Sequence, residues 1–149
     1  MNHARSVPTI THDAAREVVS AAVAAAEGIA VPVCIAIADP GGNLVAFLRM
    51  DGAPLLSARI AQDKAYTVSA FNGLPTHRWY GLLEDEPALL HGIVHTERLV
   101  IFGGGVPLAD SDGLLMGAVG VSGGSAEQDR EIAEAAASGL GVSAAGAQG

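Results

Sequence analysis

The segment "VIFGGGVPLADSDG", residues 100–113, places three consecutive glycines between an apolar run and a proline. A P-loop requires Gly-Lys-Ser or Gly-Lys-Thr at a fixed distance from its first glycine, and this segment contains neither. A dinucleotide-binding loop requires G-x-G-x-x-G at the start of a helix, whereas "LLMGAVGVS" (114–122) has the composition of a strand. We therefore expect the glycines to form a bend at the edge of a sheet, where another group approaches the backbone closely.

Strands are predicted on both sides of this bend and in an earlier region of the chain. The turn signal "DPGGN", residues 39–43, separates two apolar runs at 31–38 and 44–50. Because proline presets one backbone angle and glycine permits positive φ, these runs are predicted to pair as a β-hairpin. Two further strands are expected at 98–102 and 114–122, separated by the glycine segment and a turn.

Helices are predicted where apolar residues recur every three or four positions. The long helices are predicted at 11–27, 55–71 and 125–140, and a shorter one near 77–85. Ser125 and Gln128 have the spacing of a capping box at the start of the last helix. The order of helices and strands predicts an α/β (α+β) fold, a single domain in which one antiparallel sheet is flanked by helices.

The composition indicates one domain that associates with copies of itself. The chain has 149 residues, and we expect a domain at 10–141 between a flexible N-terminus (1–9) and a flexible tail (142–149). Hydrophobic residues make up 50% of the chain and charged residues 16%, against roughly 25% charged in typical domains. We therefore expect a homo-oligomer whose subunits bury apolar surface against one another.

Charge and sequence pattern also limit the partners. The formal net charge of −8 disfavours nucleic acid and anionic membranes as partners. No apolar run reaches the ~18 residues of a membrane span. The start "MNHARSVPT" lacks the apolar core of a signal peptide, so we expect a cytoplasmic protein. Cys34 is the single cysteine, which excludes an internal disulfide, and its apolar surroundings predict a buried thiol.

Lys64 conflicts with the pattern of its helix. It lies four residues from both Ile60 and Val68, on the stripe that is predicted to face the core. A buried lysine needs a partner or a depressed pKa. One interpretation is an ion pair with an inward carboxylate or a snorkelling side chain, and the other is a desolvated functional amine.

Further charged residues share faces with apolar ones. Asp129 lies on the apolar stripe of the last helix, where it either compensates the helix dipole or has a functional role. Arg49 and Asp51 are predicted to share a strand face with Val45 and Phe47. Arg49 can bind the carboxylate of a ligand or form a salt bridge with a nearby aspartate.

His91 and His95 are four residues apart, a spacing that can hold a metal ion on a helix. Gly92 and two β-branched residues disfavour a helix there, and no H-E-x-x-H motif is present. We therefore predict no metal site and expect one of the two histidines to line a pocket.

Three blocks of the chain together resemble the GlcG/HbpS family of heme-binding proteins, which includes the C-terminal domain of PduO-type proteins. The blocks are "ADPGGNLVAFLRMDGAPLLSARIAQDKAYTVSAF", "GIVHTERLVIFGGGVPL" and "GAVGVSGGSAEQDREIAEA". The resemblance implies a profilin-like α+β fold and homo-oligomers, and heme binding or assistance in heme degradation for some members. The positions that match the family's motifs are Gly41, Gly42, Lys64, Gly104, Gly105, Pro107, Ser122, Gly123 and Gly124.

Two functions from different classes follow as hypotheses. The first is binding of heme or a related tetrapyrrole, held without a C-x-x-C-H attachment motif. The alternative is a cofactor-independent lyase, isomerase or hydrolase acting on a small organic acid or aromatic catabolite, with Lys64, Arg49 and Asp51 as catalytic residues. A third option is an assembly protein with a vestigial pocket. The candidate ligand-binding residues are His91, His95, Glu97, Gly103, Gly104, Gly105, Ser122, Gly123 and Gly124, and His12 and His77 are further candidates for an axial ligand.

Overall fold

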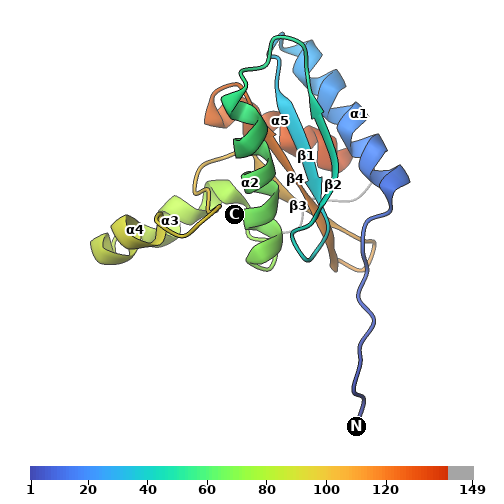
Figure 1. Cartoon of the computed structure of the whole chain (residues 1–149), viewed down its shortest axis with the longest axis vertical. Helices are drawn as coiled ribbons and strands as arrows, with labels where there is room; N and C mark the ends of the chain where they lie inside the picture. Colours follow the sequence, from blue (N-terminus) through green and yellow to red (C-terminus); the bar gives the residue numbers. More distant parts are fainter. Residues whose placement is uncertain (141–149) are drawn as a thin grey trace.

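Four antiparallel strands form one sheet in the computed structural model, which describes residues 1–140 (Figure 1). In space the strands follow the order β2-β1-β4-β3, so β1 and β4 are central. The strands are β1 (Cys34–Ala38), β2 (Leu44–Arg49), β3 (Gly105–Ala109) and β4 (Leu115–Ser122). The two hairpins β1–β2 and β3–β4 are joined side by side through the antiparallel pairing of β1 with β4.

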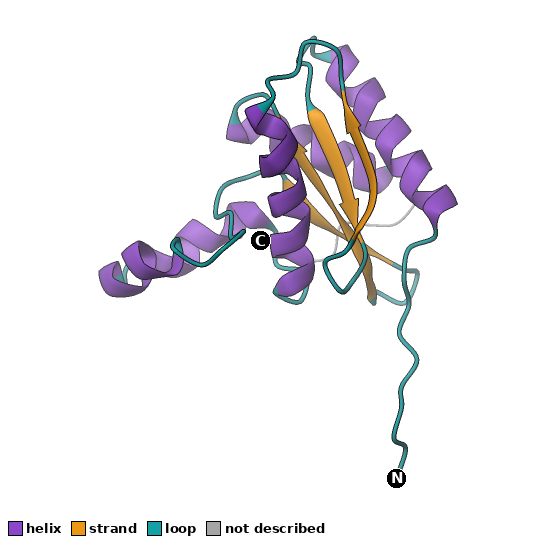
Figure 2. Ribbon diagram, in the orientation of Figure 1, coloured by secondary structure: helices purple, strands orange, loops and turns teal. Residues whose placement is uncertain are grey.

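Helices cover both faces of this sheet (Figures 1 and 2). One face carries α1 (His12–Gly28) and α5 (Ala126–Ser138), and the opposite face carries α2 (Leu56–Ala70). The short helix η1 (Thr76–Arg78) packs against α2 and β3, and two further short helices, α3 (Trp79–Leu83) and α4 (Pro87–Ile93), extend from the body as an arm. The predicted single-domain α+β fold, an antiparallel sheet flanked by helices, is confirmed.

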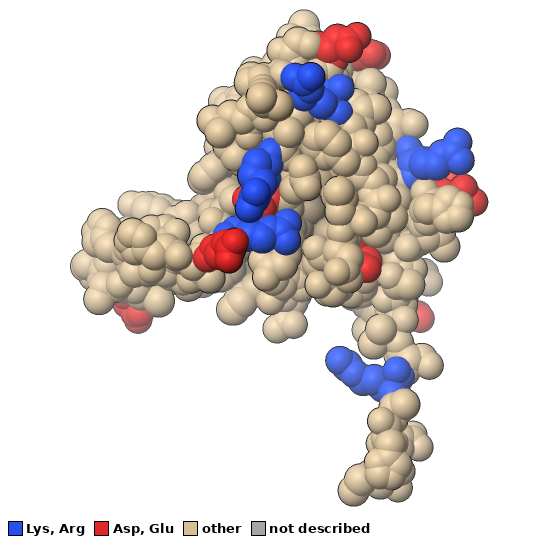
Figure 3. Space-filling model, viewed as in Figure 1, with Lys and Arg blue, Asp and Glu red and all other residues tan. Residues whose placement is uncertain are grey.

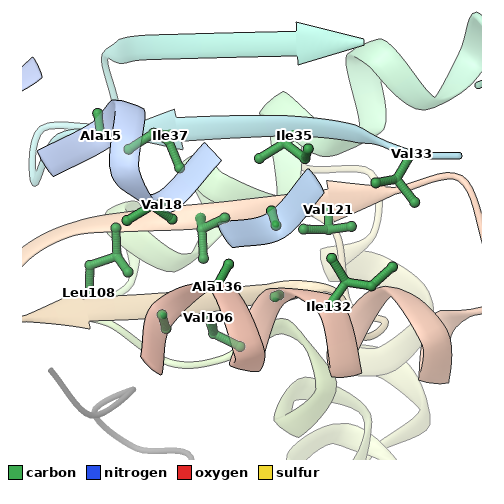
Figure 4. Packing of buried hydrophobic residues seen from close by; sticks show 14 of the residues in the cluster. Ala15, Val18, Val33, Ile35, Ile37, Val106, Leu108, Val121, Ile132 and Ala136 are labelled. Atoms are coloured by element: carbon green, nitrogen blue, oxygen red, sulfur yellow. The ribbon is translucent and has the colours of Figure 1, made fainter. Parts of the chain in front are cut away.

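The two faces of the sheet differ in side-chain size. Alternate residues of β1, β3 and β4 point branched side chains toward α1 and α5, where they are fully buried (Figure 4). Each such side chain contributes about 1.5–3 kcal/mol through its removal from water. These strand residues are Ile35, Ile37, Val106, Leu108, Val119 and Val121.

The face toward α2 is lined by small residues. Cys34, Ala36 and Ala38 of β1 lie against Ala61 and Ala65 of α2. A methyl group at position 120 of β4 would meet the carbonyl oxygen of Ala61 and lie 2.6 Å from the backbone nitrogen of Ala65. The backbone of α2 therefore rests directly on the backbone of β4, which only glycine at position 120 permits.

Both predicted turns are stabilised in the same way. Asp39 accepts hydrogen bonds from the backbone N–H groups of Gly41 and Asn43, both at 2.9 Å. Asp110 does the same for Asp112 and Leu114, also at 2.9 Å. An aspartate that caps its own turn is a standard way to close a short connection, and it fixes the register of each hairpin.

Two predictions about secondary structure are wrong. Residues 98–102 do not form a strand, because the backbone N–H of Val100 donates to the hydroxyl of Thr67 on α2, at 3.0 Å, instead of to a neighbouring strand. The strand begins only at Gly105. A helix does include His91 and Gly92, since Pro87 starts α4 at a position where proline needs no N–H partner.

The N-terminal segment joins the sheet at one point. Ile10 is buried, and its backbone N–H donates to the carbonyl of Met116 at 2.8 Å. Residues 1–9 contain neither helix nor strand, and the predicted tail at 142–149 lies outside the described residues. Within residues 1–140, no helix has both the length and the apolarity needed to cross a membrane.

Candidate functional site

Lys64 forms a buried ion pair that connects three elements. Its side chain on α2 is 0% exposed, and its Nζ donates to the carbonyl of Val121 on β4 at 2.8 Å and to Oδ2 of Asp129 on α5 at 3.1 Å. The other carboxylate oxygen of Asp129 accepts from the backbone N–H of Gly124 at 2.8 Å. The inward orientation predicted for Lys64 is confirmed, and its partner is the inward carboxylate of Asp129.

The glycines at the start of β3 leave room for this ion pair. Gly104 has φ of +128°, and a methyl group there would lie 2.6 Å from the Lys64 Nζ and 2.5 Å from the Val121 oxygen. At Gly105 a methyl group would lie 2.8 Å from the Thr76 side chain. The glycine segment is therefore a bend that a neighbouring group approaches, as predicted. The approaching groups are the Lys64 ammonium and η1.

Opposing effects act on the charged form of Lys64. Burial lowers the pKa of Lys64, and the charge and hydrogen bond of Asp129 partly oppose that effect. The Phe102 ring lies 5.1 Å from Nζ and adds a cation–π contact. The ammonium is thus sealed from solvent, and its hydrogen bonds to Val121 and Asp129 are those of a structural ion pair.

Gly123 and Gly124, which follow β4, also make contacts within the protein. The N–H of Gly124 is bonded to Asp129, and Ser122 is buried at the end of β4. Gly123 has φ of +145°, and a methyl group there would lie 2.6 Å from the carbonyl of Pro32. The amide of Gly124 is therefore not free for an anionic ligand.

Arg49 and Asp51 lie in a different place from Lys64. Together with Glu27 of α1 they line an open hollow of about 430 Å³ at the end of β2. A bulge at Val45 offsets the β1–β2 register, so that Val45 packs with the α1–α5 core while Phe47 pairs with Ala36 on the opposite face. The predicted common face is therefore wrong for Val45, whereas Phe47 and Arg49, which pair with Ala36 and Cys34, share a face as predicted.

The arm carries the two candidate histidines. His91 lies in the last turn of α4, His95 follows that helix, and both are exposed, as is Glu97. No residue of α4 is buried. Within residues 1–140, no group of three or more His, Cys, Asp or Glu side chains is placed to hold a metal ion.

His77 is the histidine that contacts the glycine segment. A methyl group at Gly103 would lie 3.5 Å from the Cβ of His77. Both ring nitrogens of His77 are buried without a hydrogen-bond partner among the described residues. Burial lowers the pKa of His77, and the positive charge of Arg130 lowers it further. Sequence spacing gave no signal for this contact, because it depends on how η1 packs against α2 and β3.

Apolar hollows and exposed apolar side chains surround the arm. A hollow of about 220 Å³ between α2 and the arm is lined in part by Tyr66, Phe71 and Trp79. A second hollow, of about 430 Å³, is lined in part by Phe71, Arg78 and Leu114. The large apolar side chains exposed on or beside the arm are Phe71, Tyr80, Leu82, Leu89, Val94 and Phe102.

The antiparallel four-stranded sheet with helices on both faces defines a profilin-like α+β protein. Residues 10–138 match the family model described as "Haem degrading protein HbpS-like". The chain therefore belongs to the HbpS-like family, and the resemblance to GlcG, HbpS and the C-terminal part of PduO is confirmed.

Three relatives illustrate the similarity. A 15.0 kDa protein of Citrobacter freundii is 42% identical over 138 residues, which cover 91% of this chain and 95% of that protein. The crystal structure of protein ORFY of Klebsiella pneumoniae has a TM-score of 0.86 at 34% identity and covers 95% of this chain and 97% of its own. The crystal structure of a PduOC–heme complex has a TM-score of 0.83 at 35% identity and covers 91% of this chain and 98% of its own.

Proposed function

We propose that this chain binds heme. The observation that carries the proposal is the similarity to the PduOC–heme complex over nearly the whole of both chains. The description of the matching family, a haem degrading protein, supports the same ligand. Heme, when bound, supplies an iron centre that a protein tunes through the axial ligand, hydrogen bonds and burial.

The residues of the arm fit a heme that is held without a covalent link. His91 and His95 present accessible imidazoles, and apolar side chains such as Leu89 and Val94 are exposed on the same arm. Arg78, which lines the hollow of about 430 Å³, is the candidate partner for a propionate. Of the two histidines we favour His95, which precedes the segment leading to the glycine bend, with His91 as the second candidate.

A second copy of the chain is part of this proposal. No residue of α4 is buried, and His91 and His95 are exposed, so the chain alone does not enclose a ligand that is bound to them. A heme on the exposed arm therefore needs cover from outside the chain. We propose a homo-oligomer in which another subunit covers the arm, burying more than about 1,000 Å² in total. A cytoplasmic location remains a prediction from the sequence.

The enzyme alternative is not favoured by the geometry. Lys64 is sealed within an ion pair, while Arg49 and Asp51 line an open hollow to which Lys64 does not contribute. A catalytic base and an arginine that binds the substrate carboxylate must lie beside the same substrate. The buried position of Lys64, apart from Arg49, does not allow this arrangement.

Hemin titration tests the proposal. The wild type should give a sharp Soret band that saturates at a fixed stoichiometry. His95→Ala or His91→Ala should shift that band, because the axial ligand sets the electronic state of the iron. His3→Ala, in the exposed N-terminal segment, is the matched control and should leave the spectrum unchanged. A broad band that does not saturate and responds to no histidine substitution would indicate nonspecific adsorption and refute the proposal.

A further inference from the structure

Two arginines share one carboxylate on the outer side of α2. The Nε of Arg98 donates to Oδ1 of Asp63 at 2.8 Å, and the Nε of Arg59 lies 3.3 Å from Oδ2 of the same carboxylate. Two positive charges face one negative charge, so the cluster keeps a net positive charge on a chain of formal net charge −8. Figure 3 shows basic side chains gathered over α2 with acidic atoms between them.

Arg98 is held rigidly. Its φ is +67°, a conformation that a bulky residue adopts only when its surroundings enforce it. Its carbonyl accepts from the Thr67 hydroxyl at 3.0 Å, and its guanidinium lies 4.0 Å from the centre of the Tyr66 ring. Residues of α2 therefore hold the backbone, the Nε atom and the guanidinium plane of Arg98 in place. This restraint lowers the conformational entropy that is lost when the guanidinium binds a ligand.

The terminal nitrogens of both arginines remain available. Among the described residues they donate no hydrogen bond, because Asp63 engages only the Nε atoms. Both side chains line one open hollow of about 460 Å³, whose other walls are Gln62 and the β1–β2 turn at Gly42, Asn43 and Leu44.

The turn that closes this hollow is also rigid. Asp39 holds the side-chain amide of Asn43 at 3.1 Å and its backbone N–H at 2.9 Å. A methyl group at Gly42 would lie 2.9 Å from the Tyr66 ring, so the turn packs against the same ring that supports Arg98. Glu97, the carboxylate next to Arg98 in the chain, lines the neighbouring hollow with Tyr66 and Trp79.

We propose that this hollow binds a small oxyanion, the carboxylate or phosphate group of a metabolite, between Arg59 and Arg98. Guanidinium groups with free terminal nitrogens match the paired oxygens of carboxylate and phosphate. The Asp63 carboxylate positions both arginines and leaves one net positive charge for the ligand. The site is distinct from the heme-binding arm residues and does not depend on the proposed heme function.

The probes are succinate and inorganic phosphate, each titrated without hemin into ¹⁵N-labelled protein at low ionic strength. Saturable shifts are expected for the Nε–H signals of both arginines and for the amides of Gly42 and Asn43. The probe that binds more tightly identifies the group that the site prefers. The affinity should fall as salt is raised, because the site is open to solvent.

Substitutions distinguish a binding site from a structural ion pair. Arg98→Gln should raise the dissociation constant about tenfold or more, since it removes a charge-assisted forked contact. Arg59→Gln should also weaken binding and leave the fold intact, because that side chain is 68% exposed. Arg16→Gln, an exposed arginine on α1, is the control and should bind as the wild type does. The absence of saturable shifts with either probe, or shifts that persist in both Arg98→Gln and Arg59→Gln, would overturn the proposal.

Discussion

Replacing Lys64 by methionine should be among the most destabilising substitutions in this chain. Methionine matches the length of the lysine stem, so the change removes the charge with little loss of packing. Among residues 1–140, it leaves the Asp129 carboxylate, 3% exposed, with one hydrogen bond, from the backbone N–H of Gly124. It also leaves the Val121 carbonyl without its donor. Breaking a buried pair from one side costs about 3–5 kcal/mol in the free energy of unfolding, a large part of the total stability of a domain.

A double variant distinguishes the net contribution of the ion pair to stability from the cost of leaving one buried charge unpaired. Asp129→Asn alone strands the ammonium and should cost about 3 kcal/mol. Lys64→Met combined with Asp129→Asn leaves no buried charge, and the asparagine oxygen still accepts from Gly124. The double variant should therefore lose only about 1–2 kcal/mol, mainly from the unpaired Val121 carbonyl. The two single effects are then strongly non-additive, with a coupling energy of at least ~2 kcal/mol.

The assay is urea unfolding of the wild type, both single variants and the double variant, with equal m-values as the check on two-state behaviour. Arg16→Met, which breaks an exposed pair with Asp13, is the control and should cost under about 1 kcal/mol. Additive single effects, or a Lys64→Met cost as small as that of the control, would refute the reasoning.

Three further predictions follow from packing and protonation. Gly120→Ala should destabilise the protein by more than about 3 kcal/mol, because its methyl group meets the α2 backbone. Gly28→Ala has no atom near its added methyl group and should be neutral or stabilising by up to ~1 kcal/mol. Urea unfolding measures both effects. Burial lowers the pKa of His77, so between that lowered pKa and about 6.5 the unfolded chain binds more protons. The contribution of His77 to stability is therefore complete above pH ~6.5 and is lost as the pH falls below it; His77→Gln should flatten that part of the stability profile, and an unchanged profile would contradict the assignment. Burial raises the pKa of the Cys34 thiol, which should stay unlabelled by a thiol reagent at neutral pH until the protein unfolds; rapid labelling of the native protein would contradict its buried position.

The sequence predicted the parts of the fold that depend on local signals. Turn residues such as Asp39 and Asp110 set the hairpins, and the Ser125–Gln128 capping box starts α5 as expected. The inward position of Lys64 followed from helical periodicity alone. The failed strand at 98–102 shows the limit, because an apolar run carries no sign that Thr67 will bind its backbone.

The arrangement of the candidate site was harder to predict. The pairing of Lys64 with Asp129 joins residues 65 positions apart, and nothing in local spacing identifies such a partner. The same holds for Arg59, Asp63 and Arg98, where the two arginines meet at one carboxylate only after the 98–100 segment is tied to α2. His91 and His95 were identified as candidates, but their exposure on an arm depends on how α3 and α4 leave the body of the protein.

The link between Lys64 and Asp129 also bears on the order in which the chain folds. The β3–β4 hairpin can form through local contacts, whereas the ion pair exists only after α2 and α5 have both docked, one on each face of the sheet. Until then both charged groups remain hydrated, so the free-energy cost of their desolvation arises in the last docking step. We therefore expect the pair to be absent from the transition state for folding and to act mainly on the unfolding rate. The charge-free double variant should fold at least as fast as the wild type, and Lys64→Met should mainly shorten the lifetime of the native state.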